Sequence, residues 1–278
     1  MTEMPELEAA WTALQASGLS SEDSVRLVEG VTEVPETWAP LRDRLPFEGD
    51  QAMERVLLLL ASAAYEPRIA DCPVPESVKQ RLRQEHQQFA KARKQQPLLM
   101  GSSAFVSACK FATLRRFPAG PLDWEVSGFP RSWLARVGWE APKMGAYLTA
   151  HIGGFSPLFF THVARPPYNR SLVLEREVLR TYHRIARAMS MQPEIKGLMT
   201  AAWFHDPAMV KDRPHLEPLN RVYLQGGGLI VTMPAGEQTE ADHPVSAKEG
   251  IAVIGRRELL AWADAHAEYD EERTTVNS

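Results

Sequence analysis

The sequence predicts an α+β protein, in which a mixed or antiparallel sheet with flanking helices follows a helical N-terminal region. Up to residue 116 the apolar residues recur at helical spacing, whereas from Phe117 onward proline, glycine and tryptophan become frequent. Beyond that point short apolar segments alternate with helical ones. The helices are too few and too unevenly spaced for a doubly wound parallel sheet.

Three regions are expected along the chain. Residues 1–116 form a helical N-terminal region, residues 117–270 an α+β domain, and the charged residues 271–278 a disordered tail. In the first region the prolines separate predicted helices, whose ranges are 6–16, 21–28, 53–65, 76–96 and 102–116.

The second region alternates between strands and helices. Predicted strands cover 123–126, 146–152, 158–163, 195–204, 223–225, 229–233 and 249–254. Predicted helices cover 171–189, 212–219 and 256–269.

Composition limits the function. The formal net charge of −4 argues against nucleic acid as the main partner, because such binding needs a basic surface. The basic residues of the 76–96 helix are interpreted as its solvated side, with a phosphate or nucleic-acid contact as the alternative. Cys72 and Cys109 give no disulfide framework, and the N-terminus has no secretory signal, so a cytoplasmic location is expected. The longest apolar stretch, residues 56–64, is too short to span a membrane.

Histidines gather in the middle of the α+β domain. Imidazole transfers protons near neutral pH and binds metals, so this stretch is the first place to look for chemistry. Each histidine also has an ordinary explanation as a core or surface residue. Of the eight in the chain, five lie in this stretch: His151, His162, His183, His205 and His215.

The segment from Trp203 to Pro207 has the highest concentration of side chains that could form a functional site. It ends a predicted strand with Trp203, His205 and Asp206, and Pro207 then turns the chain. Strand ends commonly present such residues to a cleft. The alternative is that Asp206 caps the next turn and Trp203 fills the core.

The helix 171–189 contributes one further candidate. Glu175 begins the face that carries Val178 and Tyr182, and it is the best-placed proton acceptor on that helix. The alternative is a salt-bridged surface position among neighbouring arginines.

Two glycine clusters, 153–154 and 226–228, could let backbone amides approach a phosphate. Neither matches a phosphate-binding loop or a dinucleotide fingerprint, so both are interpreted as turns. A metal-dependent phosphohydrolase of the HD type is an alternative reading of His205-Asp206. It would enlist His162 or His183 together with Asp242 or Asp264, but its family places the His-Asp pair on a helix.

From Leu158 onward, the order of elements resembles the C-terminal half of GNAT-type acyltransferases. The resemblance covers residues 120–265 and rests on topology. It implies that the junction before the helix 171–189 holds the pyrophosphate of an acyl-CoA, and that a nearby carboxylate, histidine or water takes a proton from the attacking amine. The family's Q/R-x-x-G-x-G/A signature is not matched: Gln225 to Gly228 has Ile230 in the last position, and residues 165–170 lack glycine.

The resemblance predicts an acyltransferase that moves an acyl group from a thioester, on coenzyme A or on a carrier protein, to an amine or similar acceptor. His162, His205, Asp206 and Glu175 are the predicted proton carriers. Arg165, Arg170, Trp203 and His215 are the predicted binding residues, with no metal. A non-catalytic protein whose helical region docks onto a partner is the main alternative.

Overall fold

The computed structural model describes residues 65–93, 106–107, 110–111, 113–164, 168–234 and 248–271. They have an α+β fold with a six-stranded mixed sheet and flanking helices, which confirms the predicted class. The described residues form two compact units, 65–72 with 79–117 and 73–78 with 118–271. The helices expected at 6–16 and 21–28, most of the helix 53–65 and the tail from 272 lie outside the described residues.

The first unit contains α5 (Tyr65–Asp71) and most of α6 (Glu76–Arg93). Ile69 and Leu82 are fully buried in it. Lys79 donates a hydrogen bond through Nζ to the carbonyl oxygen of Ala70, 2.6 Å away, near the carboxyl end of α5. A cation at that end of a helix stabilises carbonyls that have no helical partner.

The sheet has the strand order β1-β2-β3-β4-β6-β5. Its central pair, β3 and β4, is parallel, and α10 makes the crossover between them. The pairs β2–β3, β4–β6 and β5–β6 are antiparallel. The strands are β1 (Arg116–Pro118), β2 (Leu122–Ser127), β3 (Leu158–Val163), β4 (Gly197–Ala202), β5 (Leu229–Pro234) and β6 (Lys248–Gly255).

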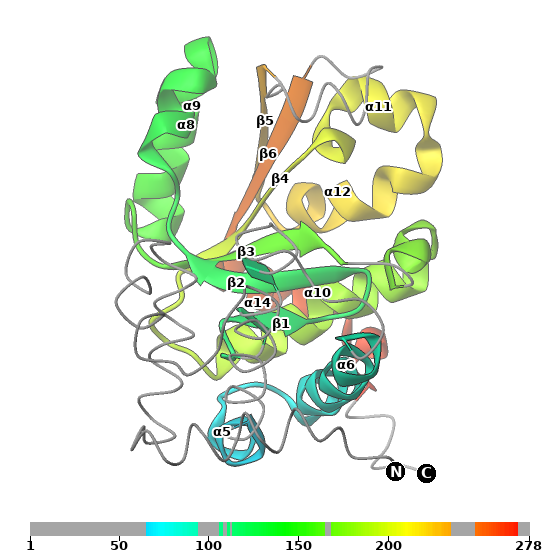
Figure 1. The fold of residues 1–278 in the computed structure, drawn as a ribbon. Coiled ribbons are helices and arrows are strands. Elements are labelled where there is room, and N and C mark those ends of the chain that lie inside the picture. The colour runs from blue at the N-terminus through cyan, green and yellow to red at the C-terminus, as the bar shows by residue number, and fades with distance from the viewer. Residues whose placement is uncertain are drawn as a thin grey trace, which may run out of the picture. The chain divides into compact units, whose positions relative to one another are not determined.

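Helices cover both faces of the sheet in the second unit. On one face α8 (Arg131–Arg136), α9 (Ala141–Tyr147) and the π-helix η3 (Leu148–Ile152) bury an apolar core against β3 to β6. On the other face α10 (Glu175–Ser190), α12 (Glu217–Gln225) and α14 (Arg256–Ala265) pack together. Figure 1 shows α8 and α9 on one side of β4 to β6, with α12 and the short α11 (Pro207–Asp212) on the other.

Two predicted strands are helical. Residues 146–152 belong to α9 and η3, because Met144, Leu148 and Ile152 recur every four residues and all face the core. Residues 223–225 end α12, where the buried Leu219, Val222 and Tyr223 are spaced three and four residues apart, as on one face of a helix. In both cases these apolar residues are buried, but the predicted strand period was wrong because they recur at helical spacing.

Several boundaries also move. The strand expected at 195–204 ends at Ala202, and Trp203–His205 form the 3-10 turn η5. The helix expected from Ser171 begins at Glu175, after the 3-10 segment η4 (Tyr168–Val173). The helix expected up to residue 116 ends earlier, since Arg116 already belongs to β1. Among the described residues, no helix is both long and apolar enough to cross a membrane.

Candidate functional site

The two central parallel strands separate at their carboxyl ends. β3 and β4 pair at only three positions, from Phe159 opposite Leu198 to Thr161 opposite Thr200. Both strands then continue for two residues without pairing to each other, to Val163 and Ala202. Ligands of open α/β sheets bind outside the carboxyl ends of parallel strands, so this divergence is the candidate site.

On the α10 and α12 face, buried hydroxyl groups meet at the point of divergence. The Thr161 and Thr200 hydroxyls are hydrogen-bonded to each other across the strand pair. The Thr200 Oγ1 lies 3.0 Å from the hydroxyl oxygen of Tyr223 on α12. Burial raises the pKa of the Tyr223 phenol to about 12, so the group keeps its proton at neutral pH and can donate a hydrogen bond.

Tyr182 fixes Tyr223 from the side of α10. Its hydroxyl donates to the carbonyl oxygen of Leu219 at 3.0 Å, which ties α10 to α12. The two tyrosine rings meet edge to face with centroids 5.7 Å apart. Both residues are fully buried, so the phenol of Tyr223 has one defined position.

His162 points to the opposite face of the sheet, because successive residues of a strand alternate. Its Nε2 lies 3.4 Å from the Oε1 of Glu125 on β2, and its ring centroid lies 4.5 Å from that of Phe160. The His162 side chain is 29% exposed and that of Glu125 14%. Asp123, almost fully buried, is opposite His162 in the register. This face therefore offers a partly accessible imidazole beside two carboxylates.

His205 lies in η5 on the α12 face and is almost completely buried. Its Nδ1 is 2.5 Å from the Oδ1 of Asn220 on α12, and its ring packs edge to face against Tyr223 at 5.5 Å. Burial lowers the pKa of His205 to about 4, although the contact with Asn220 opposes that shift. The imidazole is therefore neutral at physiological pH.

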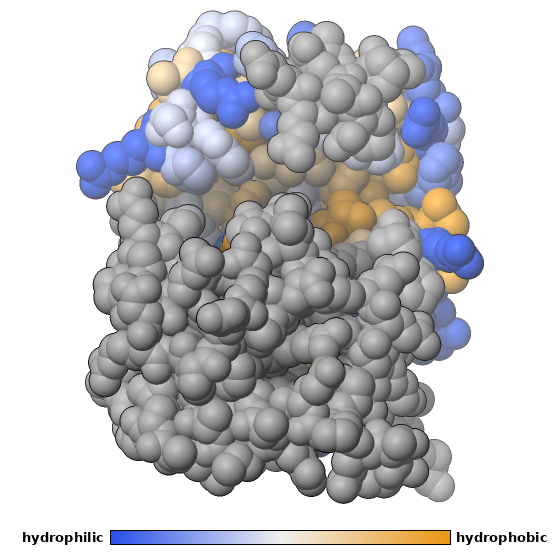
Figure 2. Space-filling model, in the orientation of Figure 1, coloured by the Kyte–Doolittle hydropathy of each residue, from blue (hydrophilic) through white to orange (hydrophobic). Residues whose placement is uncertain are grey.

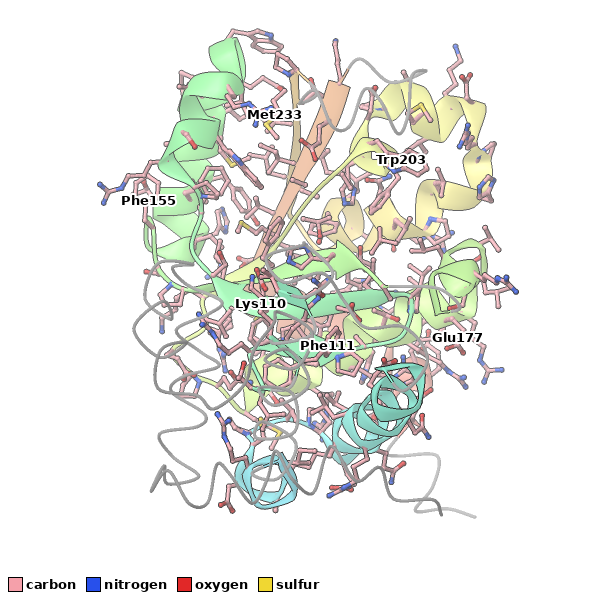
Figure 3. The ribbon with its side chains drawn as sticks, viewed as in Figure 1. Lys110, Phe111, Phe155, Glu177, Trp203 and Met233 are labelled. Carbon is pink, nitrogen blue, oxygen red and sulfur yellow. The ribbon has the colours of Figure 1, made fainter. Side chains whose placement is uncertain are left out.

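Trp203 and Asp206 flank His205. The Asp206 Oδ1 accepts a hydrogen bond of 3.1 Å from the backbone amide of Ala208, so it is the N-cap of α11. Trp203 is partly exposed, and the guanidinium of Arg213 lies 5.6 Å from its ring centroid. Figure 3 shows Trp203 beside α11 and Met233 beside α8 and α9, on the two sides of the strands.

The other predicted site residues, a proton carrier and three binding residues, lie at the surface or outside the described part. Glu175 is exposed at the start of α10 and forms an ion pair with Arg221. Arg170 in η4 and His215 in η6 (Pro214–Leu216) are exposed. Arg165 lies outside the described residues. The predicted set is thus divided, with His162 on one face of the sheet and His205 on the other.

Sequence reasoning missed Tyr223, Thr161, Thr200 and Asn220. Tyr223 was assigned to a strand, which hid its place one turn from Asn220 on a helix. The signal for the threonines was available, because each is a polar residue in a mainly apolar strand. A buried polar group needs a partner, so two such positions on adjacent strands indicate a contact between them.

The structure also bears on the metal-site hypothesis and on the two glycine clusters. Within the described ranges, no group of three or more His, Cys, Asp or Glu side chains is placed to hold a metal ion. His183 is buried in α10, Asp264 is exposed on α14, and Asp242 lies outside the described residues. Gly153 and Gly227 have positive φ angles of 79° and 82°, and they lie in turns that follow η3 and α12.

Apolar residues are exposed at the end of β3 and just before α10. Val163 ends β3 and is 38% exposed, while Val173 and Leu174 precede α10 and are 56% and 55% exposed. Figure 2 shows apolar surface across the middle of the visible described part, between hydrophilic surface at its sides. An apolar ligand segment could be bound at such a surface.

Comparisons with known proteins give no assignment, since no protein family, no curated protein and no solved structure matches the chain.

Proposed function

We propose that this protein transfers an acyl group from a thioester, carried by coenzyme A or by a carrier protein, to an amine or similar nucleophile. The observation that carries the proposal is the parallel pair β3–β4, which separates after Thr161 and Thr200 and has a buried phenol at the separation. Ligands of open sheets bind outside the carboxyl ends of parallel strands, so an extended thioester arm would bind at this end of β3 and β4. The order β3-α10-β4-α12-β5-β6 is in line with the resemblance to GNAT-type acyltransferases.

In the proposed reaction the amine nitrogen attacks the thioester carbonyl carbon, a C–N bond forms and the C–S bond breaks. His162 takes the proton that the amine loses. Glu125, 3.4 Å from its Nε2, stabilises the imidazolium that results. The His162 side chain is partly exposed although its Nε2 is buried, so its Nδ1 would take the proton of an acceptor arriving from solvent.

The leaving thiolate takes its proton from solvent, and Tyr223 stabilises the thiolate charge with a hydrogen bond. Its hydroxyl is the buried donor at the divergence, and Thr200 and Tyr182 hold it in place. Trp203 and the exposed Val163, Val173 and Leu174 would contact the acyl and pantetheine parts of the donor. Arg165 and Arg170, which precede α10, would receive its phosphates, because a helix N-terminus and arginine both favour anions.

The test is an acyl-transfer assay on the full chain. Acetyl-CoA and longer acyl-CoAs are incubated with a panel of primary amines, the free thiol is followed with a thiol-reactive dye, and the N-acyl product is identified by mass spectrometry. We expect His162→Ala to lower the turnover rate by about a hundredfold or more, the usual contribution of general base catalysis. Tyr223→Phe should lower it by about tenfold or more, because the thiolate then loses the hydrogen bond that stabilises its charge.

The matched control is His266→Ala, which removes an imidazole whose Nδ1 contacts the carbonyl oxygen of Trp262 at 2.8 Å in the C-terminal helix. It should leave turnover within about twofold. Melting curves of all variants separate lost catalysis from lost folding. The proposal is wrong if the wild-type chain releases no thiol from coenzyme A thioesters or from a phosphopantetheinylated carrier. It is also wrong if His162→Ala and His266→Ala reduce turnover equally.

A further inference from the structure

One ring nitrogen of His205 has no role in the proposed reaction. Among the described residues its Nε2 has no hydrogen-bond partner, although the residue is only 1% exposed. A buried polar atom without a partner destabilises the folded protein, because the atom has lost its hydrogen bonds to water. Proteins rarely keep such an atom unless a ligand or a bound water uses it.

The hydrogen bonds of Asn220 identify which His205 nitrogen carries the proton. The Asn220 Nδ2 donates to the carbonyl oxygen of Phe204 at 3.0 Å, so the amide oxygen is the atom that faces His205. That oxygen only accepts, and the His205 Nδ1, 2.5 Å away, must donate to it. In a neutral imidazole the Nε2 then holds a lone pair and no hydrogen.

The position of this lone pair is fixed. A Cβ added at Gly250 of β6 would lie 2.6 Å from the carbonyl oxygen of His205, so the backbone of η5 rests directly on the strand. Phe204 and Tyr223 hold the imidazole from two other sides, with ring centroids 4.6 Å and 5.5 Å away. An acceptor held this rigidly recognises a ligand without losing side-chain entropy on binding.

We infer that the Nε2 of His205 accepts a hydrogen bond from an amide N–H or a hydroxyl of a ligand at the carboxyl end of β4. A neutral lone pair does not favour an anion, and a bare acceptor cannot bind a carbonyl oxygen, so the ligand group must be a donor. The identity of this ligand as the amide-bearing arm of a thioester donor rests on the proposed function. The assignment of the His205 Nε2 as a hydrogen-bond acceptor is independent of the proposed function.

The test is nitrogen NMR of the full chain labelled at its histidines, with His205 assigned by its loss in His205→Gln. Two probes are titrated, coenzyme A, which has two amide N–H groups, and N-methylacetamide, a bare amide. We expect the Nε2 resonance of His205 to move with both. Adenosine 3′,5′-bisphosphate, which lacks the amide arm, should leave it in place.

Calorimetry adds a second measurement. His205→Phe should weaken coenzyme A binding by about tenfold, the loss of one hydrogen bond, and leave adenosine bisphosphate binding unchanged. His205→Gln, which can place an amide oxygen near the Nε2 position, should retain most of the affinity. If His205→Phe does not fold, the NMR titration of the wild-type chain decides alone.

The outcomes separate the two ideas. If coenzyme A saturates the protein and the Nε2 resonance does not move, the inference is overturned while the proposed function stands. If neither coenzyme A nor a phosphopantetheinylated carrier binds but N-methylacetamide moves the resonance, the inference stands and the proposed function fails. If neither probe moves it, His205 is a structural residue and the inference is wrong.

Discussion

The hydroxyl groups of Thr200 on β4 and Tyr223 on α12 lie 3.0 Å apart in the interior, where neither side chain is more than 2% exposed. The contact joins a strand to a helix 23 residues further along the chain. Tyr223 approaches Thr200 at the last residue pair of β3 and β4, so this contact marks where the sheet opens.

Thr200→Val tests the strength of that contact. Valine has nearly the same shape and suits a strand, but it leaves the Tyr223 hydroxyl without this partner, so the free energy of unfolding should fall by about 1–2 kcal/mol. Thr232→Val on β5 is the matched control and should change it by less than about 0.5 kcal/mol. Urea denaturation measures both. Equal losses in the two variants would mean that the hydroxyl contact contributes nothing.

His205 should make folding stability depend on pH. Its pKa of about 4 in the folded protein is below the value of 6.5 in the unfolded chain. The unfolded state therefore binds more protons between these values, and stability should fall as the pH decreases from about 6.5 to 4, by up to about 1.4 kcal/mol per pH unit. Above pH 6.5 the contribution is fully present.

Between pH 4 and 6.5, the free energy of unfolding should change less with pH in His205→Gln than in the wild type. His215→Gln, which changes an exposed histidine in η6, should follow the wild-type curve. Parallel curves for the wild type and His205→Gln would contradict the assignment of a neutral buried imidazole.

Gly250→Ala should be strongly destabilising, because its added methyl group would overlap the backbone and Cβ of His205. Separating η5 from β6 to make room should cost about 2 kcal/mol or more. Gly145→Ala in α9 is the control, since a Cβ there meets nothing within 4 Å. It should stabilise the protein by about 0.5–1 kcal/mol through the higher helix propensity of alanine. Thermal unfolding measures both variants. Equal melting temperatures for Gly250→Ala and Gly145→Ala would show that η5 does not pack tightly on β6.

The free edge of β5 is covered by side chains. The Glu140 Oε2 accepts a 3.0 Å hydrogen bond from the Thr232 amide, and the Arg136 guanidinium donates one of 3.0 Å to the carbonyl oxygen of Pro234. The backbone groups of an unpaired strand edge can form hydrogen bonds with a strand of another chain, so Glu140→Ala should increase self-association. Glu140→Gln keeps an oxygen acceptor and should behave as the wild type. Sedimentation velocity at several concentrations measures this. Identical profiles for Glu140→Ala and the wild type would show that the edge is not an association site.

Part of the fold could be predicted because apolar period is a local property. The strand at 158–163 was predicted with the bounds that β3 has, since its apolar run is short and set between turns. The strands predicted at 146–152 and 223–225 were wrong, because each segment continues a helical apolar pattern that begins earlier in the chain. The tertiary packing of Leu148 and Tyr223 decided those segments.

The candidate site could be predicted only in part. The sequence alone determined that His162 lies near the end of an apolar strand and that the Trp203–Asp206 segment lies at the end of another, because both depend on neighbours along the chain. Only the tertiary structure decided that His162 and His205 lie on opposite faces. It also decided that Asn220 determines which His205 nitrogen is protonated, and that Thr161, Thr200 and Tyr223 meet where the strands part. These contacts join residues 15 to 39 positions apart, and strand register and helix rotation, which set them, are fixed by packing over the whole sheet.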